Sequence, residues 1–145
     1  MVEQVEHGGR ILAMILRTSF KKQGIEFFTP GTYSQQLGYM GHPKGHVIKP
    51  HVHNEVAREV LFTKEVLFIK SGKVRVDFYE DDQSYLHSKV LEAGDIILLA
   101  FGGHGFEMLE ESEIIEVKQG PYAGEQDKTR FEPVATASLK IEENL

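Results

Sequence analysis

The sequence predicts an all-β protein, built as a sandwich or barrel of short strands. Its apolar runs are short and are separated by turns rich in glycine or acidic residues, a pattern typical of antiparallel strands. Residues 73–80 (KVRVDFYE) alternate, with Val74, Val76 and Phe78 on one side, as in a strand with one buried face. No long stretch has a convincing amphipathic helical pattern. Together these observations indicate an all-β sandwich or barrel.

The first third of the chain is expected to hold three short strands. Residues 10–17 (RILAMILR) form an apolar run that suits a strand buried on both faces, although the composition also allows a helix turn. A second apolar patch, 25–28, ends at the turn dipeptide Pro30-Gly31. A third strand is expected at 36–40, followed by a loop over 41–45 (GHPKG).

The second half of the chain predicts a hairpin and several further strands. Residues 65–70 and 73–80 are expected to pair around a Ser71-Gly72 turn. The remaining strands are expected at 85–91, at 96–100, from His104 to Met108 with His104, Phe106 and Met108 on one face, and at 114–119.

The length bounds the domain organisation. A chain of 145 residues with 41% hydrophobic content is enough for one domain with a real core, expected over residues 1–120. The strand pattern fades after Gly120-Pro121. Residues 121–145 form a tail for which three possibilities stay open: crossing to a neighbouring subunit, packing as a short helix, or disorder.

Composition excludes several classes of partner. The net charge of −6 without a cluster of Lys and Arg argues against nucleic acid, because phosphate binding needs clustered cations. The absence of cysteine excludes disulfides and thiolate zinc sites. The N-terminus lacks a basic region followed by an apolar one, and no run is long enough to cross a membrane. We expect a soluble, cytoplasmic protein with no membrane partner.

Four residues form a candidate metal site. His51 and His53 are two apart, so on a strand their imidazoles point to the same face. Glu65 opens the next apolar run, and His104 lies in a later segment, GDIILLAFGGHGF. Three imidazoles and one carboxylate are a ligand set for a divalent metal ion.

The order and spacing of these residues resemble the cupin superfamily over roughly residues 36–118. Its first motif, G-x5-H-x-H-x3,4-E-x6-G, is similar to the series Gly45, His51, His53, Glu65 and Gly72, except that eleven residues separate His53 from Glu65. Its second motif, G-x5-P-x-G-x2-H-x3-N, is matched more loosely, by the series Gly94, Gly102 and His104, with Ala100 in place of the proline and Met108 in place of the asparagine.

The resemblance implies a fold, an assembly and a ligand set. The fold would be the double-stranded β-helix, a jelly-roll barrel. The assembly would be a homodimer, with Val66 and Phe68 as candidates for the buried contact. The metal ligands would be His51, His53, Glu65 and His104.

The insertion over residues 54–64 has two possible conformations. Val56, Val60 and Leu61 have helix-like spacing, but the composition also allows an extension of the strand pair. Glu55 and Glu59 compete with Glu65 as the carboxylate ligand. Glu65 is favoured because it has a glycine turn seven residues on.

Four other residues are candidate substrate contacts. Lys49 shares side-chain parity with His51 and His53, so on an unbroken strand it would face the same cavity, although Pro50 can turn it outward. Tyr39, Phe106 and Met108 are candidate pocket lining.

The predicted site supports two classes of function. Three imidazoles and a carboxylate leave two positions open on an octahedral ion of Fe, Mn, Ni or Zn, as in catalytic sites. The first hypothesis is a metal-dependent small-molecule enzyme, either a dioxygenase or an isomerase or lyase acting on a sugar or oxo-acid. The second is a non-catalytic ligand-binding or sensor barrel, since this fold hosts both enzymes and non-enzymes.

Overall fold

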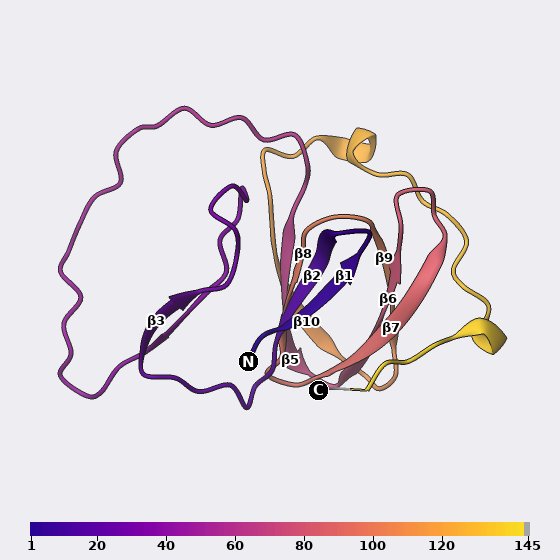
Figure 1. Cartoon of the computed structure of the whole chain (residues 1–145), viewed down its shortest axis with the longest axis horizontal. Coiled ribbons are helices and arrows are strands. Elements are labelled where there is room, and N and C mark those ends of the chain that lie inside the picture. Colours follow the sequence, from indigo (N-terminus) through magenta and orange to yellow (C-terminus); the bar gives the residue numbers. More distant parts are fainter. Residues whose placement is uncertain (144–145) are drawn as a thin grey trace.

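The computed structural model describes residues 1–143 and confirms the all-β prediction. Two antiparallel sheets face each other, and a separate two-stranded hairpin lies to one side (Figure 1). None of these sheets closes into a barrel, so the expected architecture is confirmed only as all-β. No helix within the described residues is long and apolar enough to cross a membrane.

The first sheet has five strands in the order β1-β2-β8-β5-β10. Its strands are β1 (Glu3–His7), β2 (Arg10–Leu16), β8 (Ile96–Leu99), β5 (Glu65–Ser71) and β10 (Glu113–Lys118). Strand β2 pairs with the central strand β8, with Ala13 opposite Leu99, although the two strands are far apart in the sequence. Four of these strands agree with the predicted ones, whereas β1 contains too little apolar sequence to be predicted.

The second sheet has three strands in the order β7-β6-β9. They are β7 (Tyr85–Glu92), β6 (Lys73–Tyr79) and β9 (Gly103–Met108). Strand β9 pairs with β6 in a register that places His104 opposite Phe78 and Phe106 opposite Val76. Within the described residues, β6 is the one strand that pairs with β9, so the other edge of β9 has no neighbouring strand.

The predicted hairpin between β5 and β6 is wrong. These strands are consecutive in sequence but belong to different sheets, so the chain crosses the sandwich at Gly72. Gly72 has φ of 89°, and a Cβ there would lie 2.2 Å from the Ser112 hydroxyl and 2.4 Å from the Glu111 carbonyl. Glycine is therefore required for a crossing of this kind, rather than for a two-strand turn.

The core lies between the two sheets, which together we call the body. Val74, Val76 and Phe78 of β6 are at most 1% exposed, which confirms the predicted buried face. They pack against residues of the first sheet, which include Ala13, Ile15, Leu67, Ile69, Ile97 and Leu99. Strand β2 is buried on both faces, as predicted, because Met14 packs on the opposite side of the sheet.

A second apolar cluster covers the outer face of the five-stranded sheet. Met14 and Leu98 pack there against Leu37, with Phe28 and Tyr33 beside them. These last three residues belong to the connection between β3 (Gly24–Phe27) and β4 (Gly38–Gly41), which pair with each other. The β3–β4 hairpin is therefore anchored on the face that points away from the second sheet.

Residues 43–62, which we call the arm, form neither helix nor strand, and every one of them is exposed. Figure 1 shows the arm as a wide arc beside the β3–β4 hairpin, away from the body. The prediction that His51 and His53 lie on a strand is therefore wrong for the single chain. The segment 54–64 adopts neither of its two expected conformations. Pro50 and the long insertion leave these residues without a strand to pair with.

The C-terminal tail packs on its own body. It contains two short 3₁₀ turns, η1 (Gly124–Asp127) and η2 (Thr136–Ser138). Phe131 lies edge-on to Tyr79 with ring centroids 4.9 Å apart, and the Val134 N–H donates to the Tyr79 hydroxyl at 3.0 Å. Of the possibilities for this tail, the described part shows packing against the second sheet.

A buried ionic cluster joins the N-terminal strand to both sheets. The Arg17 guanidinium donates to Glu3 at 2.6 Å and to Asp95 at 2.9 Å, and the Lys89 ammonium lies 3.3 Å from Glu3. Asp95 also accepts the backbone N–H groups of Thr18 at 2.9 Å and Glu92 at 2.8 Å. Glu3 and Asp95 are only 8% and 3% exposed, so their charges depend on these partners.

Candidate functional site

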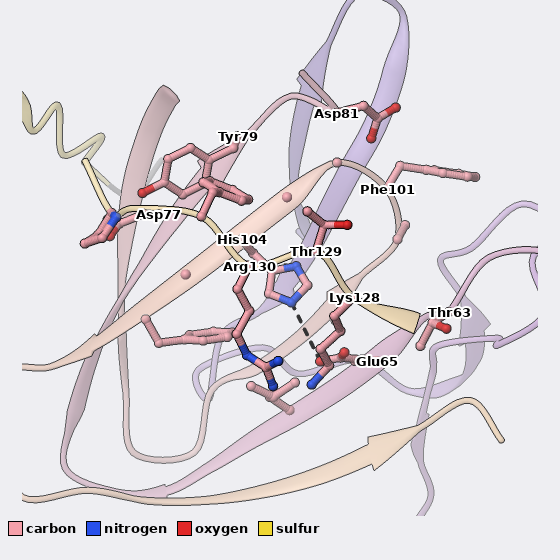
Figure 2. Close-up of a pocket in the computed structure, with 18 of the residues that line it drawn as sticks. Thr63, Glu65, Asp77, Tyr79, Asp81, Phe101, His104, Lys128, Thr129 and Arg130 are labelled. Atoms are coloured by element: carbon pink, nitrogen blue, oxygen red, sulfur yellow. Dashed lines mark ion pairs between the residues drawn. The ribbon is translucent and has the colours of Figure 1, made fainter. Parts of the chain in front are cut away.

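Glu65 and His104 meet in the space between the two sheets. Glu65 is the first residue of β5 and His104 the second residue of β9, and the imidazole Nε2 lies 3.7 Å from the carboxyl Oε2 (Figure 2). The two side chains are 12% and 27% exposed. Lys118, opposite Glu65 on β10, places its ammonium 3.8 Å from the other carboxyl oxygen. The structure thus brings together two of the four predicted metal ligands.

Burial shifts both groups toward their neutral forms. Burial, and then the hydrogen bond and charge of Glu116, raise the pKa of Glu65 to about 7, against the opposing charges of Lys118 and Lys128. Burial lowers the pKa of His104 to about 4. Near neutral pH the imidazole is therefore uncharged, which is the form that ligates metal ions. The Glu65 carboxyl group, with its pKa of about 7, is partly protonated near neutral pH.

A cavity of about 1040 Å³ surrounds this pair and follows the free edge of β9. All six residues of β9, from Gly103 to Met108, line it. Successive side chains of a strand point to opposite faces. Because every residue of β9 lines the cavity, the cavity extends past both faces of this strand. Leu67 and Ile114 line the part between the sheets, and Tyr79 lines the part beneath the tail.

The other two predicted ligands lie on the arm. His51 and His53 have ring centroids 5.1 Å apart, and His51 Nδ1 lies 3.1 Å from the Lys49 carbonyl oxygen. Over residues 1–143, no group of three or more His, Asp or Glu side chains is close enough to hold a metal ion. The single chain therefore forms two separate pairs, one buried and one exposed.

The predicted substrate contacts divide in the same way. Phe106 and Met108 line the cavity beside Glu65 and His104. Tyr39 instead packs edge-on against Phe20 with centroids 4.8 Å apart, on the hairpin side of the molecule. Lys49 is exposed on the arm, because the strand that would have aimed it at the cavity is absent.

The sequence analysis missed several residues near the pair. Glu116 on β10 lines the cavity and acts on Glu65, and the tail contributes Lys128, Thr129 and Arg130 (Figure 2). Lys64, next to Glu65 in the sequence, does not line the cavity: it is 5% exposed, and its ammonium lies 4.4 Å from the centre of the Phe101 ring. The alternation of Ile114, Glu116 and Lys118 could have indicated that Glu116 lies on the cavity side, but nothing in the tail sequence indicates its path.

Fold and site together define an all-β protein with a buried imidazole–carboxyl pair beside a large cavity. No protein-family model matches the chain, and no curated protein or solved structure matches it either. The cupin resemblance therefore rests on the motif residues alone.

Proposed function

We propose that this chain is a metal-binding, cupin-type protein that acts as a metal-dependent enzyme on a small molecule. The ligands are Glu65 and His104 of the body and His51 and His53 of the arm. One observation carries the proposal: residues of two different sheets, far apart in sequence, place an imidazole 3.7 Å from a carboxyl group in a sheltered position. The jelly-roll barrel and the homodimer are part of the same proposal.

The donor chemistry of the buried pair fits a divalent metal ion. Burying an imidazole and a carboxyl group together is costly, and a bound cation compensates by taking their lone pairs. Two donors are too few to hold the ion against water, so the two histidines of the arm complete the set. A bound Fe, Mn, Ni or Zn ion would supply a Lewis acid for a substrate oxygen, or a redox centre in the case of iron.

The chain's own residues would hold the substrate in the cavity. Leu67, Phe106 and Ile114 give it an apolar wall, while the tail residues Lys128 and Arg130 add cations to a lining that also carries carboxyl groups, such as that of Glu116. A small polar molecule of the sugar or oxo-acid class suits a lining that mixes apolar side chains with hydrogen-bonding groups of both signs. His104, being uncharged near neutral pH, can ligate without first losing a proton.

A non-catalytic ligand-binding or sensor protein is the second candidate. One observation favours it: only two of the four donors meet in the single chain. Such a protein would use the cavity to hold a ligand, with or without the ion.

Metal reconstitution tests the first proposal. Protein stripped with a chelator is loaded with Fe, Mn, Ni or Zn in turn, and bound metal is measured by mass spectrometry. Wild type should retain about one ion per chain, while His104→Ala and Glu65→Gln should lose most of it. Matched controls are His7→Ala and Glu92→Gln, which lie on other strands outside the cavity.

The outcomes separate the two candidates. Wild type that retains none of the four metals would rule out the metal site. If metal is retained, turnover of a panel of sugars and oxo-acids supports an enzyme. Ligand-dependent thermal stabilisation without turnover supports the binding protein.

A further inference from the structure

We infer that the arm of one chain lies along the free edge of β9 in a second copy, so that two copies exchange arms. The partner's His51 and His53 then join Glu65 and His104, and each site takes residues from both chains. The metal-binding part of this inference rests on the proposed function, whereas the exchange itself is argued from the arm and the edge.

The arm exposes more apolar surface than an isolated loop normally does. Seven large apolar side chains among its twenty residues are more than 40% exposed: Val47, Ile48, Val52, Val56, Val60, Leu61 and Phe62. Single exposed apolar residues are ordinary, but seven within one segment of twenty residues are a concentration typical of a surface that binds another molecule. The hydrogen bonds of His51 with Lys49 and of Arg58 with Val56 are local, so they do not bury these side chains.

The edge of β9 is shaped for an extended segment. Its unpaired backbone groups offer hydrogen bonds to one more strand, and the cavity runs past both of its faces. An added strand would place alternate side chains toward the pair and away from it. His51 and His53, two apart, would then both point toward Glu65 and His104, with Val52 on the opposite face.

The anchoring of the arm favours a second copy over its own chain. The arm begins at the β3–β4 hairpin, whose connection packs on the outer face of the five-stranded sheet through Leu37. The edge of β9 borders the space on the other side of that sheet, and Figure 1 shows the arm running away from it. At its far end the arm returns to its own body, where Phe62 borders the cavity and contacts Phe101, and Thr63 donates to Asp127. The part that lies away from its own body is therefore the middle of the arm, which carries His51 and His53.

Exchange between two copies is also a closed arrangement. In a two-fold dimer each chain donates one arm and receives one. Both arms and the free β9 edges of both chains are then paired. Each copy carries one buried pair and one exposed pair, and the dimer therefore has two sites of four ligands. The partner copy supplies residues without which the site is incomplete.

The oligomeric state of metal-free protein is the first test. Light scattering on chelator-treated wild type should give the mass of a dimer. The double variant Ile48→Asp/Val52→Asp should give a monomer that remains folded, because the arm does not form part of the body. The control Tyr122→Asp changes an apolar side chain that is 90% exposed outside the arm and should leave the dimer intact.

Cysteine cross-linking locates the arm without any metal. The chain contains no cysteine, so introduced ones are the only thiols. A Cβ at Gly105 would meet only Tyr79, at 3.8 Å, which makes Gly105→Cys acceptable beside His104. A mixture of Val52→Cys and Gly105→Cys chains should form disulfide-linked dimers faster than either variant alone. In the double variant, a bond within one chain would instead show that the arm covers its own β9.

Complementation tests the shared metal site. His51→Ala/His53→Ala and Glu65→Gln/His104→Ala should each bind almost no metal alone. Refolded together and purified through two different tags, the mixed dimer has one site with four intact ligands, so it should bind about half as much metal per chain as wild type. If both halves of a site came from one chain, the mixed dimer would bind none.

The results keep the two proposals apart. A dimer that cross-links between chains but binds no metal supports the exchange and refutes the proposed function. If wild type binds metal, then binding by a monomer, or a mixed dimer that binds none, supports the metal site and overturns the exchange.

Discussion

The body and the arm both contain apolar side chains, but they differ in what covers them. Ile69 in β5 is fully buried between the sheets, whereas Ile48 in the arm is 52% exposed. In the body, every strand finds a neighbour within the same chain, and alternate residues face the opposite sheet. The arm has no neighbour of this kind, so the same residue type contributes no packing energy there.

The stability of the fold comes from the body, and the arm contributes little to it. The body is expected to fold by itself, since its core and its ionic cluster are complete within one chain. The arm adds two imidazoles and little else to that fold. Changes at buried body residues other than Glu65 and His104 should therefore alter stability, whereas matched changes in the arm should alter assembly and, at His51 and His53, metal binding. In dilute, monomeric protein, the free energy of unfolding should therefore depend on the body and not on the arm.

The largest effect is expected from Asp95→Ala. The variant leaves the Arg17 guanidinium without one of its carboxylates and removes the acceptor of two backbone N–H groups. Breaking a buried charge network of this kind costs about 3–5 kcal/mol. The matched change Glu59→Ala, exposed on the arm, should stay within about 0.5 kcal/mol. Urea unfolding measures both, and equal losses would contradict the division between body and arm.

Ile69→Ala and Ile48→Ala compare the same substitution in the two regions. Removing the fully buried Ile69 side chain should cost about 2–5 kcal/mol, because it leaves a cavity in the core. Ile48→Ala should change the free energy of unfolding by less than about 0.5 kcal/mol. A larger cost for Ile48→Ala that appears only at high protein concentration would show that a second copy buries the arm.

The smallest effect, and the pH-dependent one, is expected from Glu3→Gln. Burial alone would raise the pKa of Glu3, but the hydrogen bonds and charges of Arg17 and Lys89 outweigh it, so the pKa lies below its ordinary value of 4.5. The stability from the ionised carboxylate is complete above that value and is lost as the pH falls through the lowered folded pKa. Glu3→Gln should therefore cost about 1–3 kcal/mol at pH 7, and less as the pH falls below 4.5.

The matched control for this pH dependence is Glu55→Gln on the arm. Glu55 is exposed, so its substitution should have little effect at either pH. Thermal or urea unfolding at pH 7 and in mild acid checks the pair of variants. A cost for Glu3→Gln that stays constant down to acid pH would contradict the assigned role of the Glu3 charge.

Much of the fold could be predicted because the strands of the body carry their pattern locally. The alternation around Val76 and the continuous apolar run of β2 both reflect which residues are buried. This pattern can be seen directly in the order of apolar and polar residues along each strand. The order of the strands within a sheet cannot be predicted from these local patterns. Two apolar runs around Gly72 predict a β5–β6 hairpin, but a crossing between sheets requires glycine at that position just as a turn does.

The candidate site could be predicted only in part, for a similar reason. Glu65 and His104 lie at strand positions, so the predicted strands place them correctly. His51 and His53 have the spacing of a strand, but a strand forms only where a neighbour supplies hydrogen bonds. Within one chain no neighbour does, and the spacing alone does not show whether another chain supplies it.

The pairing of β2 with β8 has a consequence for synthesis. Ala13 leaves the ribosome long before Leu99, its partner in the sheet, so a nascent chain carries β2 with the apolar face of Ala13 and Ile15 open to water. The first sheet is completed only when β10 has also been made. The chain is thus expected to fold late and slowly, as proteins rich in non-local strand pairs do, and to depend during translation on whatever shields β2 from aggregation.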